Sequence, residues 1–371
     1  MSDETKNYYP LPESKGGWRS PKEAGQIRAL AGIDLDKLSP ARAWNIQFQV
    51  TSAVVIVRRG YLVAEWYENG ALPDTKFNIY SCTKSFTGTA YGLLFDEGRQ
   101  GRLPAGQVVD LDSPAYPHIP AGYPLTDSRK ERIKLRHLLS MTSGIPGESI
   151  GIAGVRTEPG TNPFEAALGR FPLKGNESTA ELWAARLAAE PGSRWDYSDP
   201  AFAHLSLAFR NITGQEISQF MQERVFDPIG IESLTWDMLG VDDGRIGQHT
   251  NPCGSIHTTA RELARFGYLM LRHGVWEGRP IVAPWWIELS SRTSQPLNPA
   301  YGLTWWSNAQ GALWPEAPRD AFSAMGFNTN MCGIIPSLDL VVVRIGLGPT
   351  DPTEVISAPF LAAIVQAVIA E

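Results

Sequence analysis

The sequence feature that most constrains the fold is a pair of β-hairpin patterns near opposite ends of the chain. Residues 52–66 are two β-branched runs joined at Arg59-Gly60, and residues 332–345 repeat this pattern around a Pro-Ser-Leu-Asp turn. Residues 301–307 are a further short strand candidate. Strands at both ends, with helices between and after them, favour an antiparallel sheet assembled from distant parts of the chain. The expected fold class is therefore α+β, an antiparallel sheet flanked by helices.

The middle of the chain has a different pattern, in which apolar residues recur at three- and four-residue spacing. This spacing predicts amphipathic helices over residues 135–141, 179–189, 201–212, 216–225 and 259–273. We therefore expect a discontinuous α/β domain (residues 1–95 and 245–371) and a mainly helical inserted domain (residues 96–244). The active site is expected in the cleft between these two domains, a usual place for a small-molecule site.

Composition excludes several classes of protein. The chain has 371 residues, of which 43% are hydrophobic and 19% charged, enough to bury a sizeable core. Its 33 basic and 39 acidic residues give a net charge of −6 without a basic tract, which argues against nucleic-acid binding. The three cysteines (Cys82, Cys253, Cys332) lack the spacing of a metal or redox motif. We therefore predict no metal site.

Two terminal segments bear on localisation. The N-terminus has neither a basic nor an apolar signal region, which predicts a cytoplasmic protein unless a signal peptide was removed. The most apolar stretch, residues 355–370, is too short and too often interrupted to span a membrane. It predicts a C-terminal helix with one face against a sheet. The oligomeric state does not follow from the sequence.

The strongest chemical motif is Ser81-Cys82-Thr83-Lys84, followed by a helical pattern that Gly98 could close in a left-handed cap. Ser81 is thus expected near a helix N-terminus, where free N–H groups favour developing negative charge. Lys84 lies one turn further on the same face. A serine becomes a nucleophile when a base removes its proton, and a lysine of lowered pKa can be that base. Alone, the spacing equally fits a surface lysine after a capping serine.

Six further blocks follow this motif in order. They are residues 133–146, 191–199, 225–236, 254–274, 301–306 and 324–343. The ordered set resembles the serine β-lactamase-like family, which includes class C β-lactamases, D,D-peptidases, and related esterases and amide hydrolases. The resemblance covers nearly the whole chain from residue 52 onward. It implies a β-lactamase/transpeptidase-like fold and a serine hydrolase that works through an acyl-enzyme without a cofactor.

The resemblance also implies roles for individual residues. Ser81 matches the acylated nucleophile, and Lys84 matches its paired base. Tyr197 matches the tyrosine of the family's Tyr-x-Asn motif, which exchanges protons with the lysine and delivers one to the leaving group. The backbone N–H groups of Ser81 and Phe327 match the oxyanion hole, which stabilises the transition state.

Two positions depart from the family pattern. Asp199 replaces the usual asparagine, and a carboxylate paired with Lys84 would raise the lysine pKa. We therefore expect Asp199 to point elsewhere or to be protonated. Residues 324–326 stand at the place of the family's third motif, which ends at Gly326. Ala324 replaces the basic residue of that motif, and alanine cannot anchor a substrate carboxylate. Both departures argue against an efficient β-lactamase or D,D-carboxypeptidase and fit neutral esters or simple amides.

Three tryptophans near the expected site, Trp195, Trp305 and Trp306, are either core residues or the lining of an apolar substrate pocket. Trp306 is the candidate for substrate contact, because the block that contains it precedes the strand facing the site in this family. Asp199, Ala324 and Gly326 complete the predicted substrate-binding residues.

A competing motif, Gly-Glu-Ser149-Ile-Gly, fits the nucleophile elbow of α/β-hydrolases. That mechanism needs a strand before the serine, a helix after it, and a later acid and histidine. The flanking residues match neither a strand nor a helix. Histidines that could serve this motif are His204, His249, His257 and His273.

The preferred functional hypothesis is a carboxylesterase acting on small acyl esters through a Ser81 acyl-enzyme. Amide hydrolysis of linear oligomers or D-amino-acid derivatives comes second, and weak β-lactamase or D,D-peptidase activity comes third. A non-catalytic penicillin-binding-like module remains an alternative whose sequence support is Asp199. The expected partner is a small ester or amide.

Overall fold

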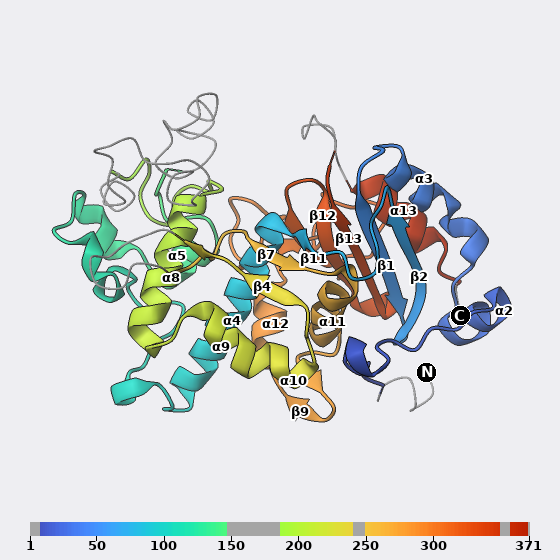
Figure 1. The fold of residues 1–371 in the computed structure, drawn as a ribbon. Coiled ribbons are helices and arrows are strands. Elements are labelled where there is room, and N and C mark those ends of the chain that lie inside the picture. Colours follow the sequence, from blue (N-terminus) through green and yellow to red (C-terminus); the bar gives the residue numbers. More distant parts are fainter. Residues whose placement is uncertain (1–7, 147–185, 240–248, 349–356, 370–371) are drawn as a thin grey trace.

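The computed structural model describes residues 8–146, 186–239, 249–348 and 357–369. Its largest element is a six-stranded antiparallel sheet (Figure 1). In spatial order the strands are β10 (Trp306–Ser307), β11 (Phe322–Gly326), β12 (Asn330–Ile335), β13 (Leu340–Gly346), β1 (Ser52–Arg58) and β2 (Tyr61–Glu68).

Both predicted hairpins are present, and they meet at the middle of the sheet. β1 pairs with β13 from Ser52 opposite Gly346 to Arg58 opposite Leu340. All residues of both strands are buried. The β1–β2 turn has positive φ angles at Arg59 and Gly60, as a two-residue hairpin turn requires.

The predicted strand over residues 301–307 is mostly wrong. β10 contains two residues, and Tyr301 contributes an isolated bridge to Trp306. The intervening backbone turns sharply, with Thr304 at a φ of 75°, because the Leu303 N–H donates to the Ser290 carbonyl and the Thr304 carbonyl accepts from Ser85 Oγ, both outside the sheet.

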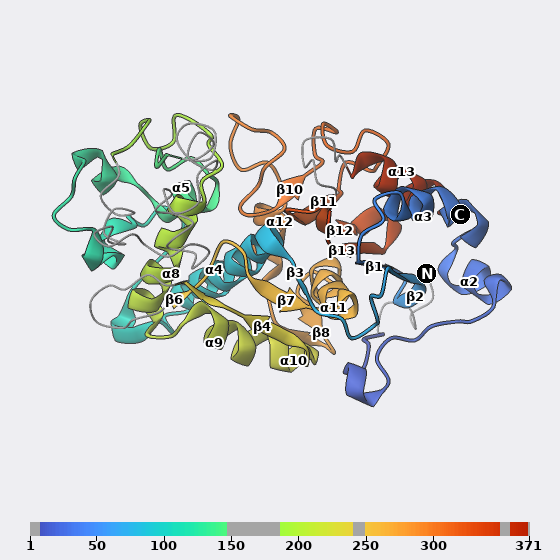
Figure 2. The same cartoon turned by 45° about the horizontal axis from the view of Figure 1, so that its top comes forward.

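Helices cover both faces of the sheet. Figure 2 shows α3 (Ser39–Ile46) and α13 (Ala358–Gln366) on one side and α11 (Ala260–Leu271) on the other. Alternate residues of β1 pack into the two resulting cores, with Val55 on the α11 side and Val54 on the α13 side. Burial on both faces explains why the central strands are mostly apolar. No helix within the described ranges is long and apolar enough to cross a membrane.

The other part of the molecule is mainly helical, as Figure 1 shows around α5 and α8. Its helices are α5 (Leu135–Leu139), α8 (Asp199–Thr213), α9 (Ile217–Met221), the π-helical η9 (Gln222–Phe226) and α10 (Asp227–Ile229). These elements, with α11, confirm four of the five predicted central helices. In the fifth, residues 186–189 are not helical, and residues 179–185 lie outside the described residues.

The remaining elements are short. Small sheets are formed by β3 (Phe77–Asn78), β7 (Ile256–Thr258) and β4 (Leu234–Trp236), by β5 (Met238–Leu239) and β6 (His249–Thr250), and by β8 (Val275–Trp276) and β9 (Arg279–Pro280). Further helices are α2 (Ala24–Ala31), α12 (Pro284–Ser290), η1 (Glu13–Lys15), η2 (Leu35–Leu38), η4 (Pro104–Gly106), η5 (Tyr116–His118), η6 (Pro120–Gly122), η7 (Ser128–Arg132) and η10 (Pro336–Leu338).

The helix α4 (Thr83–Arg99) lies between the sheet and the helical part and is buried along most of its length (Figure 1). It crosses the predicted domain boundary at residue 95, and the domain boundaries themselves stay a prediction. The predicted left-handed cap at Gly98 is wrong. The helix continues to Arg99, and the chain reverses at Gly101, where φ is 68°.

Close packing of α4 depends on glycine at Gly92. A Cβ there would collide with the indole ring of Trp286, which is 1% exposed. We expect Gly92→Ala to lower the free energy of unfolding by about 1–3 kcal/mol, because the buried ring must shift. Chemical denaturation measures this change. Gly25→Ala is the matched control, since a Cβ there meets no atom within 4 Å and should not destabilise the protein. Equal effects of the two substitutions would contradict this account.

Candidate active site

Ser81 lies in η3 (Tyr80–Cys82), a 3₁₀ turn that connects β3 to α4. Tyr80 has a φ of 47°, and its N–H donates to Asn78 Oδ1 at 2.8 Å. The turn leaves Ser81 partly exposed while Cys82 is buried in the core. The predicted position of Ser81 at a helix entrance is confirmed, and Cys82 is a core residue.

Lys84 is the buried partner of Ser81. Its side chain is 1% exposed, and Nζ lies 2.9 Å from Ser81 Oγ. The same Nζ lies 2.8 Å from the backbone oxygen of Cys253 and 2.6 Å from Asp199 Oδ1. These three acceptors match the three donors of an ammonium group.

Of the two alternatives expected for Asp199, the one in which it points away from Lys84 is wrong, and protonation stays a prediction. Asp199 is the first residue of α8, whose N-cap Ser198 accepts the Ala201 N–H at 3.1 Å. This helix start directs the carboxylate to Lys84, where it compensates for burial of the ammonium. Burial acts to lower the pKa of Lys84, but the interactions with Asp199, Tyr197 and Cys253 together outweigh it, and the pKa lies well above its ordinary value.

Tyr197 completes the group around Ser81. Its ring centroid lies 5.0 Å from Lys84 Nζ, and its hydroxyl interacts with the side chains of Ser81 and Lys84. Burial raises the pKa of Tyr197 to about 12, although the nearby Lys84 charge opposes this shift. Near neutral pH Tyr197 is therefore a phenol with a proton to give.

Aromatic side chains surround Tyr197 on the side of β10. Trp306 is partly exposed and lies parallel to Tyr197, with ring centroids 6.3 Å apart. Trp195 and Tyr301 contact both rings. Trp305, by contrast, is 1% exposed and is a core residue. Substrate contact by Trp306 stays a prediction.

The third motif of the family pattern, residues 324–326, reaches the site at the end of β11. A Cβ at Gly326 would collide with the Ile79 carbonyl oxygen and lie 3.1 Å from the Ser81 nitrogen. Glycine therefore lets this strand end pack directly on the Ser81 turn. Ala324 has no exposed surface and faces the core. The prediction that Ala324 contacts substrate is therefore wrong.

Phe327 follows Gly326, directly after the end of β11. Its side chain is 52% exposed, and its ring lies edge-on to Tyr80 with centroids 5.6 Å apart. Asn330 Nδ2 donates to the Phe327 carbonyl oxygen at 2.8 Å and so holds this peptide in place. The oxyanion role of the Ser81 and Phe327 amides stays a prediction.

Sequence reasoning missed two contributors to this site. Asn330 holds the Phe327 peptide and also reaches the Asn78 carbonyl at 3.3 Å. The Cys253 carbonyl accepts from Lys84, and a backbone atom leaves no signal in the side-chain sequence. Asn330 stands two residues before the second hairpin pattern. A polar residue at the start of a predicted strand was the signal that could have identified it.

The family assignment comes from comparison with known proteins. A family model described as Beta-lactamase matches residues 45–365. The chain belongs to the beta-lactamase family. This assignment confirms the predicted family and the expected class of serine hydrolase.

Curated relatives of this beta-lactamase family protein differ in how much they share with it. The 6-aminohexanoate-dimer hydrolase of Paenarthrobacter ureafaciens is 23% identical over 351 residues, covering 86% of this chain and 79% of that protein. Protein flp of Staphylococcus aureus (strain MW2) is 28% identical over 166 residues, covering 45% of this chain. The chain matches 29% of the length of Protein flp.

Solved structures confirm the predicted β-lactamase/transpeptidase-like fold. A Bacillus anthracis protein provisionally named a 6-aminohexanoate-dimer hydrolase superposes with a TM-score of 0.72 at 21% identity, covering 97% of this chain and 89% of that one. EstCE1, described as a hydrolase with promiscuous acyltransferase activity, gives 0.67 at 16% identity, with coverage of 91% and 98%.

The competing nucleophile-elbow motif around Ser149 lies outside the described residues. His204, one of its candidate histidines, is fully buried, and its ring nitrogens contact the Tyr116 hydroxyl and the Pro200 carbonyl. Burial lowers the pKa of His204 to about 3. His249 and His257 lie beside Glu216 and Asp237, respectively. These contacts explain His204, His249 and His257 without catalysis, and the Ser149 motif stays untested by the fold.

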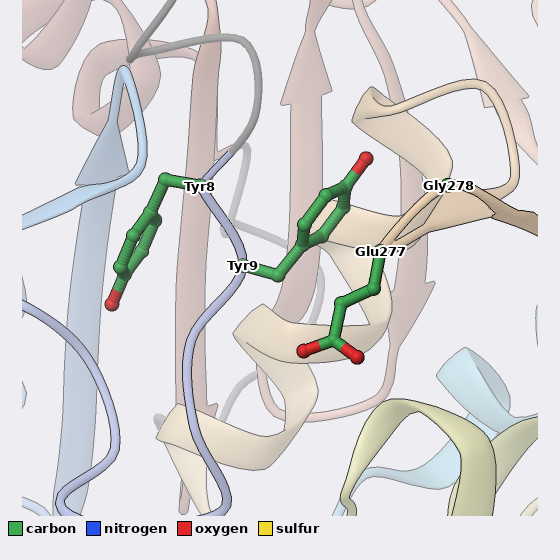
Figure 3. Close-up of a pocket in the computed structure, with 4 residues that line it drawn as sticks. All are labelled: Tyr8, Tyr9, Glu277 and Gly278. Carbon is green, nitrogen blue, oxygen red and sulfur yellow. The ribbon is translucent and has the colours of Figure 1, made fainter.

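One described cavity lies apart from the Ser81 group. It has a volume of about 380 Å³ and is lined by Tyr8 and Tyr9 of the N-terminal segment and by Glu277 and Gly278 of the β8–β9 turn. Figure 3 shows the Tyr9 ring directed toward Glu277, while Tyr8 points the opposite way. None of the predicted site residues lines this cavity.

Proposed function

We propose that this beta-lactamase family protein hydrolyses an ester or amide bond through an acyl-enzyme on Ser81. The observation that carries the proposal is the 2.9 Å contact between Ser81 Oγ and the Nζ of buried Lys84. The hydroxyl of Tyr197 interacts with the same two side chains. A nucleophile, a base and a proton donor therefore meet in one group, as covalent catalysis requires.

In the acylation step, Ser81 Oγ forms a bond to the substrate carbonyl carbon while its proton passes to Lys84 in the neutral form. The carbonyl electron pair moves onto oxygen, where the N–H groups of Ser81 and Phe327 would stabilise it. When the carbonyl re-forms, the bond to the leaving alcohol or amine breaks. Tyr197 gives that group a proton and regains one from Lys84.

Deacylation reverses these proton transfers with water as the nucleophile. Water attacks the acyl carbon, and its proton passes to Tyr197 and Lys84. The bond between the acyl carbon and Ser81 Oγ breaks, Oγ takes the proton back, and a carboxylic acid leaves. The two steps together consume one water molecule and need no cofactor.

Small acyl esters are the first-choice substrates. Partly exposed Trp306 beside Tyr197 and the exposed ring of Phe327 supply apolar surface near Ser81. Buried Ala324 supplies no positive charge for a substrate carboxylate. EstCE1, which has a similar fold, is described as a hydrolase with promiscuous acyltransferase activity, which agrees with an acyl-enzyme.

Amide hydrolysis is the second candidate. Similarity to the 6-aminohexanoate-dimer hydrolase of Paenarthrobacter ureafaciens over 86% of this chain favours linear amides of that kind. The same acylation step serves an amide, provided that Tyr197 protonates the leaving nitrogen. Hydrolysis of β-lactams is expected to be weak, because Ala324 replaces the basic residue that would hold their carboxylate.

Hydrolysis of p-nitrophenyl acetate and butyrate by wild type, Ser81→Ala and Ser149→Ala tests the proposal. We expect Ser81→Ala to lose at least about 10³-fold in rate, because no other group replaces the nucleophile. Ser149→Ala should retain activity. Intact-mass spectrometry should detect one acyl group on wild type and none on Ser81→Ala.

Loss of hydrolysis in Ser149→Ala alone would replace the Ser81 mechanism with the nucleophile-elbow mechanism. Absence of both hydrolysis and adduct in wild type, across esters, linear amides and β-lactams, would favour the non-catalytic binding module. Parallel assays of the linear amide and the esters decide which substrate class is preferred.

A further inference from the structure

We propose that Asp199 is a positioning residue that holds Lys84 as an ammonium near neutral pH, so that Ser81 becomes a nucleophile only toward alkaline pH. This inference deepens the proposed function and rests on Ser81 being the reactive serine. It gives Asp199 a role different from the substrate contact that the sequence suggested. The argument comes from the geometry around Lys84 Nζ.

The surroundings of Lys84 fit both of its protonation states. An ammonium donates to Ser81 Oγ at 2.9 Å and to the Cys253 carbonyl at 2.8 Å, and forms an ion pair with Asp199 Oδ1 at 2.6 Å. A neutral amine keeps two N–H donors and one lone pair. If Asp199 and the Cys253 carbonyl take the two donors, the lone pair is left facing Ser81. The same contacts that favour the ammonium therefore orient the free amine for catalysis.

Asp199 is held firmly in this place. It begins α8, its backbone oxygen accepts from the Cys253 thiol at 3.3 Å, and Pro200 follows it. Its side chain is 11% exposed and that of Lys84 is 1% exposed. Water and salt screen such a buried pair much less than a surface pair. The attraction between the Asp199 carboxylate and the Lys84 ammonium is therefore screened only weakly.

The other titratable groups that act on Lys84 are neutral near neutral pH. Burial raises the pKa values of the phenols of Tyr197 and Tyr301 and of the Cys82 thiol, so these groups keep their protons. The Cys253 thiol is a hydrogen-bond donor to Asp199. Among these described neighbours, Asp199 is the ion-pair partner of Lys84. The groups that face Lys84 are thus Asp199 together with Tyr197, Tyr301, Cys82 and Cys253.

The expected pH dependence follows from these charges. A negative neighbour stabilises the ammonium and raises the pKa of Lys84, so the fraction of free amine at a given pH falls. Activity should rise with pH as the group around Ser81 loses a proton. Removal of the carboxylate should move this rise to lower pH.

Asp199→Asn isolates the charge, because the amide oxygen of asparagine still accepts from Lys84. The experiment measures kcat/KM for p-nitrophenyl butyrate against pH in wild type and Asp199→Asn. We expect the acid limb to move down by about one pH unit or more. At pH values below the acid limb of wild type, kcat/KM of the variant should then be at least about tenfold higher than that of wild type.

A second readout does not depend on the substrate. A fluorophosphonate probe reacts when Ser81 Oγ bonds to phosphorus, fluoride leaves with the bonding pair, and the hydroxyl proton passes to Lys84. The rate of this labelling, followed by intact mass, should show the same shift of the acid limb. If wild type is labelled at Ser81 but hydrolyses no ester or amide, the proposed function fails while labelling still decides the role of Asp199.

Asp339→Asn is the matched control. Asp339 is 6% exposed and pairs with Arg272 at 3.0 Å, so the substitution also removes a buried carboxylate from a cation. It should leave the pH profile unchanged. An acid limb that stays in place in Asp199→Asn, or loss of labelling at every pH in a folded variant, would overturn the proposal.

A measurement on wild type covers the case in which Asp199→Asn does not fold. Lysine labelled at the ε carbon reports the titration of Lys84 by NMR, with the signal assigned from its absence in a Lys84 variant. We expect Lys84 to keep its proton through neutral pH. A Lys84 that is already neutral there would overturn the proposal.

Discussion

Replacement of Lys84 by methionine should reduce acylation of Ser81 by about 10³-fold, within the range expected for loss of a general base. Methionine fills a similar buried volume but cannot take the proton of Ser81, from which Nζ lies 2.9 Å away. The rate of butyryl adduct formation, followed by intact mass, measures the effect. Acylation at the wild-type rate would remove Lys84 from the mechanism.

The effects of Lys84→Met on stability and on activity can be distinguished with a second variant. Lys84→Met leaves the Asp199 carboxylate without its partner and should cost about 3–5 kcal/mol of unfolding free energy. The double variant Lys84→Met with Asp199→Asn removes both charges and should recover most of this loss. It should remain inactive. Recovery of hydrolysis in the double variant would show that the single variant had failed through misfolding alone.

Gly326→Ala should lower kcat/KM by about 10²-fold, because a displacement of the nucleophile by about 1 Å costs this much. The new Cβ would collide with the Ile79 carbonyl oxygen and lie 3.1 Å from the Ser81 nitrogen. Backbone atoms of η3 cannot swing aside as a flexible side chain can. The turn that carries Ser81 must therefore move.

Gly333→Ala provides the control for Gly326→Ala. Gly333 lies in the neighbouring strand β12, where a Cβ would meet the terminal methyl of Met331 at 3.1 Å. That flexible end can rotate away, so hydrolysis should stay near wild type. Equal losses in both variants would point to general disruption of the sheet instead of displacement of Ser81.

Local patterns were sufficient for much of the fold. The two hairpins were predictable because β-branched runs and turn residues stand next to each other in the chain, as at Arg59-Gly60. The helix after Ser81 was predictable from its apolar period, and the contact between Ser81 and Lys84 follows from one helical turn. The strand predicted over residues 301–307 failed because its residues bond outside the sheet.

Errors at the site came from contacts between distant residues. Ala324 was placed toward substrate, but a strand residue points to one face or the other, and the register with Cys332 puts it in the core. The Asp199 carboxylate was expected to avoid Lys84 on the ground of its effect on the pKa. Burial of Lys84 required a counterion, and the start of α8 supplied it.

The sequence by itself determined the family, the sheet built from both ends of the chain, and the proximity of Ser81 and Lys84, because these rest on residue type and short-range spacing. Only the tertiary structure decided that Asp199 pairs with Lys84, that the Cys253 carbonyl is the third acceptor, and that Gly326 packs on Ser81. Those contacts join segments far apart in the chain. Their geometry depends on how α4, α8 and the sheet pack together, and no local pattern encodes it.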